Sequence, residues 1–302
     1  MMMFINMLPT VLMMVAPILI AAIGGMVCER SGVVNIAIEG LMGIGACACA
    51  SCHYLMEAAG CGRYSIWVAL LLGCVISTLF SLIHAFAAID LKADQTISGT
   101  GINLLADGIT IFASQILFKA DRTKEYRIGM LTDKLGMYPT VYIAIIVVVL
   151  AWFVLYKTPF GMHLRACGEH PAAADSVGIN VRGIRYTGVA VSGFLSGLAG
   201  GCIVLTQTIQ YTSNTINGRG FIAIAAVAFG RWTPLGVTGA ALLFGASSAM
   251  SVIATNFQAL RVLPTEIFNI FPYVITLLAL IIFSGRDYAP AADGKPYEKG
   301  AS

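Results

Sequence analysis

The sequence has 302 residues, of which 58% are hydrophobic and only 11% are charged, and its mean hydropathy is +0.84. Soluble domains carry about 25% charged and about 45–50% apolar residues, so this composition excludes an ordinary soluble protein and predicts an integral membrane protein. The net charge of +3 is too small and too localised to indicate nucleic acid as a partner.

Apolar runs long enough to cross a membrane recur along the whole chain. A hydrocarbon core about 30 Å thick needs about 20 apolar residues per helix, and the candidates lie at residues 8–27, 37–56, 65–89, 101–118, 138–156, 185–205, 235–254 and 266–284. A ninth run, at residues 220–229, is too short. It must be a half-helix buried in protein or lining a cavity, because backbone polar groups cannot face lipid unpaired. The predicted fold is an all-α integral membrane protein with about eight or nine transmembrane helices, some of them broken or half-length.

The two ends of the chain carry different signals. The first apolar run lacks the basic start and the cleavage site of a signal peptide, so we expect a retained helix. Residues 1–284 are expected to form one membrane domain and residues 285–302 a polar cytoplasmic tail, with Lys299 and its neighbours disordered. Trp67, Trp152 and Trp232 fall near span ends, which is typical of membrane-interface anchors.

Basic residues orient the spans. Lys and Arg are enriched on the cytoplasmic side of membrane proteins, and they recur in the 157–185 loop and in the tail after residue 284. Counting back from this loop places the N-terminus outside. The basic stretch "KADRTKEYRIGMLTDK" (residues 119–134) disagrees, because the same count places it outside as well.

Three polar interruptions break the helical pattern, namely "ERSGVVNIAIEG" (29–40), "DLKADQTISGTGINLLADG" (90–108) and "QYTSNTINGRGF" (210–221). Each is compatible with an ordinary connecting loop, but broken helices with exposed ends also mark transport routes. The polar side chains on these breaks are the candidates for the pathway, since polar groups at membrane depth are costly unless they are buried or wet. They are Asn35, Glu39, Asn103, Asp107, Gln207, Asn214 and Asn217.

Glu39 has two interpretations. A carboxylate at a helix start can accept hydrogen bonds from nearby backbone N–H groups and is favoured there by the helix dipole. It can equally line the path, and Asp107 shares this ambiguity. The spacings Gly193-x-x-x-Gly197 and Gly236-x-x-Gly239 favour close helix packing over ligand binding.

A short helix is predicted in the polar stretch "GMHLRACGEHPAAADSVGIN" (161–180). Pro171 suits a first helical turn, the three alanines after it are strong helix formers, and Gly178 supplies a left-handed stop. A helix of about two turns is unstable alone in water. The segment therefore needs a partner surface, from this chain or another, and we interpret it as a docking element.

The sequence offers little support for a haem site, a metal site or a catalytic site. "CASCH" (49–53) has the spelling of a c-type haem attachment site, but it lies at the end of an apolar helix with no evident second axial ligand, so packing of small residues is favoured. His163 and His170 are too far apart for a metal site. The sequence has no phosphate-binding G-x-x-x-x-G-K-[ST] loop, no nucleophile elbow and no H-E-x-x-H helix, which predicts a non-enzymatic subunit.

Three segments carry a family resemblance. "FGMHLRACGEHPAAADSVGINVRGIR" resembles the cytoplasmic coupling segment of bacterial ATP-binding-cassette (ABC) importer permeases of the branched-chain amino acid and simple-sugar group. "ERSGVVNIAIEGLMGIGA" and "GRGFIAIAAVAFGRWTPLGVTGAALLFG" are similar to its nucleoside-type members. The resemblance implies a permease domain over residues 1–284 with a coupling segment at 157–184. It carries the ATPase-coupling role onto Phe160, Gly161, Arg165, Gly168, Glu169, Ala173, Ala174, Gly178 and Ile179.

The same resemblance implies the partners. Two permease chains would form the path in the bacterial cytoplasmic membrane, and the nucleoside-type resemblance favours a non-identical second permease. Separate ATPase subunits would bind ATP and Mg²⁺, so no cofactor is expected in this chain. An external lipoprotein or periplasmic binding protein would deliver the substrate. Nucleosides are the first choice of substrate, with pentoses or other simple sugars as the alternative.

Two readings from other classes stay open. A secondary transporter driven by an ion gradient would share the spans and broken helices, but it would not need a capped cytoplasmic docking helix. A membrane enzyme acting on a lipid-linked substrate would need a cluster of His, Asp or Glu that the sequence does not present.

Overall fold

The computed structural model describes residues 2–134, 136–254 and 288–298, with isolated positions at 270, 274, 277, 278 and 281. Throughout these residues the secondary structure is helical, without strands. The helices are α1 (Met2–Glu29), α2 (Ile38–Ala58), α3 (Tyr64–Ala85) with a short π-helix η1 (Phe86–Asp90), α4 (Gln95–Phe118), α5 (Pro139–Lys157), α6 (Pro159–Glu169), α7 (Pro171–Ser176), α8 (Val181–Thr206), α9 (Arg219–Phe229) and α10 (Pro234–Ala254).

The predicted apolar runs match these helices closely. Within the described residues, five helices are long and apolar enough to cross a membrane, at Met7–Glu29, Tyr64–Asp90, Gln95–Phe118, Pro139–Lys157 and Val181–Thr206. The short run at 220–229 forms α9, an apolar helix of 11 residues, which confirms the predicted half-length segment. The predicted span at 266–284 falls almost entirely outside the described residues.

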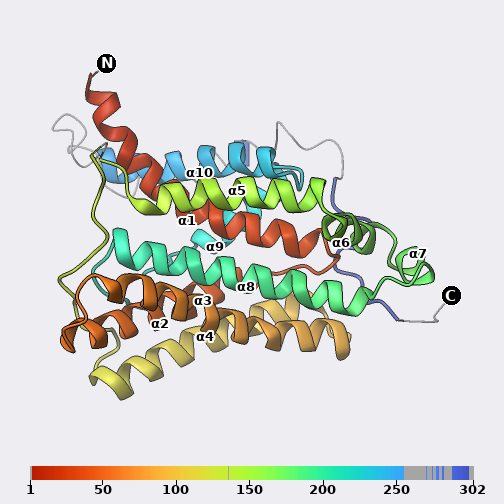
Figure 1. The fold of residues 1–302 in the computed structure, drawn as a ribbon, viewed down its shortest axis with the longest axis horizontal. Coiled ribbons are helices and arrows are strands. Elements are labelled where there is room, and N and C mark those ends of the chain that lie inside the picture. Colours follow the sequence, from red (N-terminus) through yellow and green to blue (C-terminus); the bar gives the residue numbers. More distant parts are fainter. Residues whose placement is uncertain are drawn as a thin grey trace.

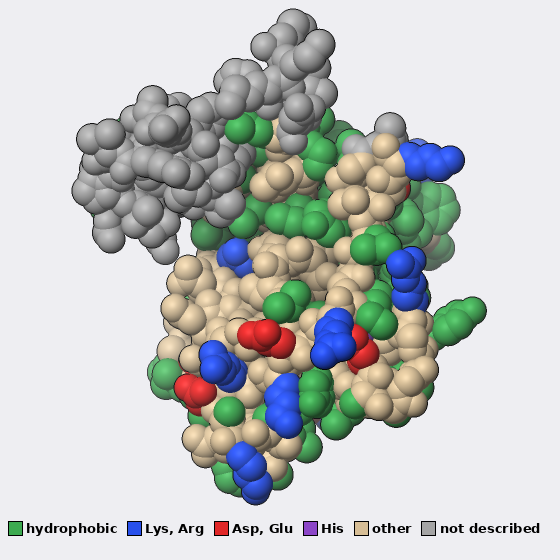
Figure 2. Space-filling view, turned by 90° about the vertical axis from the view of Figure 1, so that its left-hand side faces the viewer, with side chains coloured by type: hydrophobic (Ala, Val, Ile, Leu, Met, Phe, Trp, Pro, Cys, Tyr) green, Lys and Arg blue, Asp and Glu red, His purple; other side chains and the backbone are tan. Residues whose placement is uncertain are grey.

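The long helices run roughly parallel to the longest axis of the molecule (Figure 1). The helices α6 and α7 and residues 288–298 lie at one end, on the right of the view. The start of α1 and the 119–138 segment lie at the other end. The span count predicted this arrangement, with the N-terminus and residues 119–134 on one side and the 157–185 loop and the tail on the other. Figure 2 faces the end at which α1 starts. It shows Lys and Arg side chains interspersed with Asp and Glu, and the 119–134 segment forms part of this surface.

Small residues let the central helices approach closely. A Cβ atom added to Gly45 of α2 would lie 2.4 Å from the Cα atom of Gly197 in α8, and one added to Gly193 would lie 2.2 Å from the Ser81 hydroxyl. The packing role predicted for Gly193 and Gly197 is therefore confirmed. It also holds for Gly236, whereas Gly239 faces open space, so the prediction was wrong for Gly239. By contrast, α3, α4 and α5 expose apolar side chains outward, as expected of helices that face lipid.

Candidate translocation and coupling sites

The helices α2 and α9 both begin inside the bundle, where the first turn of α2 meets the N-terminus of α9. The Glu39 carboxylate accepts hydrogen bonds from the backbone N–H groups of Gly218 (2.7 Å) and Gly220 (2.6 Å). A Cβ atom on Gly220 would lie 2.5 Å from the Cα atom of Glu39, so only glycine fits. Helix N-termini carry unpaired N–H groups and partial positive charge. The Glu39 carboxylate accepts hydrogen bonds from two of these N–H groups and places a negative charge beside the positive end of the helix.

This geometry agrees with the first of the two interpretations of Glu39, the carboxylate that caps backbone N–H groups. The capped helix is α9, which lies about 180 residues further along the chain, so the sequence pattern around Glu39 could not identify it.

Two asparagines hold the break between α1 and α2. Asn103 of α4 accepts a hydrogen bond from the N–H of Gly40 (2.8 Å) and donates one to the carbonyl of Ile36 (2.9 Å). The side chain of Asn35 is completely buried; it accepts a hydrogen bond from the N–H of Ala37 (3.1 Å) and donates one to the Ser192 hydroxyl (2.8 Å). These contacts satisfy backbone groups that the interrupted helix leaves open, so the two side chains stabilise the break directly.

Three of the remaining pathway candidates are exposed. Asp107 lies one turn after Asn103 on α4, is exposed, and is close enough for its charge to act on the Glu39 carboxylate. Asn214 and Asn217 are exposed in the segment that leads into α9. An exposed carboxylate at membrane depth is costly against lipid, so this surface suits a water-filled path or another protein chain.

Gln207 lies elsewhere. Its side-chain amide donates to the carbonyl of Met13 (3.1 Å) near the end of α8. The structure therefore does not bring Gln207 together with the residues around Glu39.

At the end of the molecule away from the start of α1, the coupling segment (157–184) folds into two short helices, α6 and α7. The Thr158 hydroxyl caps α6 by accepting from the N–H of Gly161 (3.2 Å). A Cβ atom on Gly161 would lie 2.1 Å from the carbonyl oxygen of Val154, so this glycine permits the sharp corner after α5. Pro171 begins α7, and Gly178 follows it with φ +86°, which confirms the predicted short helix and its stop. The sequence analysis did not anticipate α6.

One face of α7 is already covered by this chain. Ala174 packs against Cys167 and Val181, with Ile179 and Tyr297 at the edge of the cluster. The outer face is free, since Ala173 is exposed and Val177 is 76% exposed. The partner surface that the short helix requires is thus supplied in part by its own chain, and the exposed face is available to another protein.

Other residues assigned to coupling point inward. Phe160 packs against the main core, and a Cβ atom on Gly168 would lie 2.3 Å from the carbonyl oxygen of Arg30. The Arg165 guanidinium lies over the ring of Tyr156 at 5.1 Å. These residues set the shape of α6 and its seat on the bundle.

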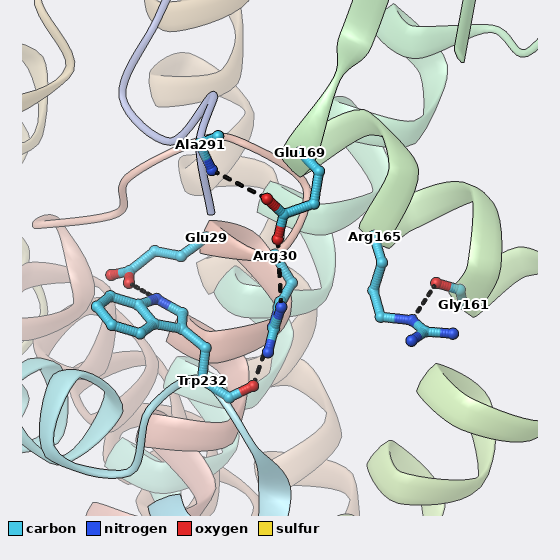
Figure 3. Close-up of polar contacts among 7 residues, drawn as sticks. All are labelled: Glu29, Arg30, Gly161, Arg165, Glu169, Trp232 and Ala291. Atoms are coloured by element: carbon cyan, nitrogen blue, oxygen red, sulfur yellow. Dashed lines mark hydrogen bonds and ion pairs between the residues drawn. The ribbon is translucent and has the colours of Figure 1, made fainter. Parts of the chain in front are cut away.

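A chain of polar contacts links the coupling segment to the membrane helices (Figure 3). Glu169 at the end of α6 forms an ion pair with Arg30 (3.7 Å), which follows the last residue of α1. Arg30 donates to the carbonyl of Trp232 in the turn between α9 and α10 (2.9 Å). The Trp232 indole N–H in turn donates to Glu29. Glu169 is thus connected, through Arg30 and Trp232, to the end of α1 and to the turn between α9 and α10.

This relay was not predictable from the local sequence pattern. Trp232 was expected to anchor the chain at the membrane interface, but its indole is hydrogen-bonded to a buried carboxylate. The signal available was the "ER" pair at the end of the first apolar run, an expensive place for charge. Its partner lies about 200 residues away, beyond any local pattern.

The tail also departs from expectation, because its described part is packed. The N–H of Ala292 donates to the carbonyl of Gly168 (2.8 Å), and Arg185 donates to the carbonyl of Lys295 (3.0 Å). Prediction of a disordered tail was wrong for residues 288–298. Lys299 lies outside the described residues.

Apolar spans, helices interrupted inside the bundle, and a polar surface at the interruption together define a multi-pass membrane transport protein. The family described as "Branched-chain amino acid transport system / permease component" matches residues 7–280. The chain belongs to this family, which confirms the resemblance found in its sequence.

Curated relatives are similar over nearly the whole chain. The guanosine ABC transporter permease protein NupQ of Bacillus subtilis is 42% identical, over 97% of this chain and 96% of its own length. The nucleoside ABC transporter permease protein NupC of Lactococcus lactis is 36% identical, over 94% and 93%. The guanosine ABC transporter permease protein NupP, also of Bacillus subtilis, is 24% identical, over 95% and 84%.

Proposed function

We propose that this chain is the membrane-spanning permease subunit of an ABC importer that moves nucleosides inward by alternating access. The observation that carries the proposal is its similarity to NupQ and NupC over more than nine-tenths of the chain. Eight full or nearly full spans plus the half-length α9 would complete the membrane domain, in a bacterial cytoplasmic membrane with the coupling segment inside.

The proposed drive is external to the chain. Partner ATPase subunits, which bind ATP and Mg²⁺, dock on the exposed face of α7 and close on one another. The coupling segment moves with them, and the contacts of Glu169 and Arg30 pass the movement to α1 and to the turn between α9 and α10.

The proposed path follows the exposed polar surface around the Glu39 junction. Asp107, Asn214 and Asn217 offer acceptors and donors suited to a ribose and a base. A second permease would supply the opposite wall. That partner is proposed to be a different chain, which is supported by two dissimilar relatives from one organism that carry the same guanosine description. A lipoprotein or periplasmic binding protein would meet the charged end of the molecule in Figure 2.

The test is uptake by proteoliposomes that contain this chain, its partner permease, the ATPase and the binding protein. Labelled guanosine, other nucleosides, ribose and glucose are supplied outside, with ATP inside. We expect nucleosides to accumulate and an excess of unlabelled guanosine to compete. Uptake of ribose or glucose without uptake of nucleosides would identify the chain as a subunit of a sugar importer instead. Uphill uptake by this chain alone, without ATPase, would instead identify a secondary transporter.

A further inference from the structure

Residues 288–298 form a continuous segment, here called the C-terminal strap, that crosses the end of the molecule at which α6 and α7 lie (Figure 1). Its course brings it against elements that are widely separated in sequence. Neither the family resemblance nor the similarity to curated relatives gives this segment a role.

The strap begins against the turn between α9 and α10 and then lies along α6. The ring of Tyr288 stacks against the Arg231 guanidinium at 4.5 Å. The N–H of Ala291 donates to the Glu169 carboxylate (3.3 Å), which is the same carboxylate that pairs with Arg30 in Figure 3. The next residue is hydrogen-bonded to the carbonyl of Gly168. The strap therefore contacts the end of α6 and also lies beside the segment that follows α1, since a Cβ atom on Gly32 would be 3.3 Å from the carbonyl oxygen of Ala292.

Its second half reaches three further elements. The carbonyl of Lys295 accepts a hydrogen bond from Arg185 near the start of α8 (3.0 Å). Tyr297 packs on the cluster that covers the inner face of α7. Glu298 forms an ion pair with Lys92 (2.7 Å), in the turn between η1 and α4. One short segment thus contacts the coupling segment, the turn between α9 and α10, the start of α8 and the turn before α4.

The most enclosed contact is the one with Arg185. This residue is only 2% exposed, and its Nε and Nη2 atoms have no hydrogen-bond partner among the residues that the structure describes. Removing the strap would take away a carbonyl that this guanidinium uses. A buried charge that loses a partner is strongly destabilising, so docking of the strap and placement of the α8 N-terminus depend on each other.

We infer that the C-terminal strap is a positioning element of energy coupling, which fixes α6 and α7 relative to α8, α4 and the α9–α10 turn. Without it, the start of α6 stays seated on the bundle through Phe160, but the end of α6 loses the hydrogen bonds from Ala291 and Ala292 and α7 loses the packing of Tyr297. Movement of α7 would then be absorbed by tilting of the coupling segment. With the strap docked, the same movement reaches the membrane helices. This inference rests on the proposed function for its transport readout, but its structural part does not.

The variants remove the strap in graded steps. One ends the chain before residue 288. A second, Tyr297→Ala, removes only the contact with α7. The matched control is Glu298→Gln, on the same strap, because its ion pair is largely exposed, with the two side chains 40% and 61% accessible, and exposed pairs contribute little.

Two measurements are made on the complete importer. The first is the amount of ATP hydrolysed per nucleoside imported. We expect this ratio to rise by at least about fivefold in the truncated chain, the lower end of typical coupling between sites. Tyr297→Ala should give a smaller rise and Glu298→Gln none. The ATPase subunit should still copurify with every variant.

The second measurement needs no substrate. Spin labels at Val177 and Thr96, both exposed, report the distance between the coupling segment and the start of α4, in a Cys61→Ser background. We expect a narrow distance distribution in the intact chain and a broad one after truncation, while a pair at Leu79 and Leu150 stays unchanged.

An unchanged distance distribution, or an unchanged ATP-to-nucleoside ratio in an importer that transports, would overturn the inference. So would a proportional loss of ATPase activity, transport and assembly, since that is the signature of a purely structural role. If the intact importer moves no nucleoside but truncation still broadens the distances, the proposed function fails and the positioning role stands.

Discussion

Replacement of Glu39 by Gln tests the junction between α2 and α9 most directly. The substitution keeps the shape of the side chain but removes its charge and turns one acceptor oxygen into a donor NH₂ group. One of the N–H groups of Gly218 and Gly220 can keep its acceptor, whereas the other, at 2.6–2.7 Å in the native protein, must face a second donor.

The magnitude follows from these contacts. Leaving one buried donor unsatisfied costs about 1–3 kcal/mol, and loss of the negative charge at a helix N-terminus adds about 0.3–2 kcal/mol. We therefore expect the start of α9 to lose about 1.3–5 kcal/mol of protection, which corresponds to about 8- to 4000-fold faster local opening at 1.4 kcal/mol per factor of ten.

Amide hydrogen exchange of a peptide covering residues 216–222, measured by mass spectrometry in nanodiscs, gives this number. The control is Glu57→Gln, which removes a carboxylate from an exposed contact with the N–H of Arg127 and should cost less than about 1 kcal/mol. If Glu39→Gln folds normally and exchange in this peptide accelerates less than about threefold, Glu39 does not hold α9 as argued.

Three further predictions concern the backbone and the strap. Gly178→Ala should destabilise the end of α7 by about 1 kcal/mol, because an L-residue there must adopt a left-handed conformation; limited proteolysis should detect this, with Gly239→Ala as a control that proceeds without strain. Gly200→Ala should prevent close contact of α2 and α8, since its Cβ atom would lie 2.0 Å from the carbonyl oxygen of Met42, and the yield of monodisperse protein should fall, whereas Gly101→Ala, with open space around it, should purify normally. Burial raises the pKa of the Asp293 carboxyl group, against the opposing effects of the Gly294 N–H and Arg185; the docked strap therefore binds a proton more tightly than the undocked strap, so docking should weaken as the pH rises above the usual range of a carboxyl group, a trend that Asp293→Asn should reduce in exchange measurements on residues 288–298.

The helices were predictable because their causes are local. Apolar runs fixed the spans, and Pro171 and Gly178 bounded α7, since proline and glycine act on the backbone at their own positions. The interruptions were also visible as polar clusters.

The pairings across the bundle were not predictable. Glu39 with α9 and Arg30 with Trp232 join residues about 180 and 200 positions apart, and one sequence contains no signal of which distant groups meet. The packed tail was missed for a related reason: its polar composition resembles that of a solvated chain, while several of the contacts that hold it use backbone carbonyl and N–H groups, which leave no trace in the sequence.

The meeting of two helix starts inside the bundle has a mechanical consequence. A continuous span must tilt or shift as a unit, whereas a polypeptide interrupted halfway can bend at the interruption while each remaining piece stays rigid. The glycine-flanked start of α9 lies against the start of α2, directly after the non-helical 30–37 segment, so both interruptions fall at one level of the bundle, and bending is easiest there.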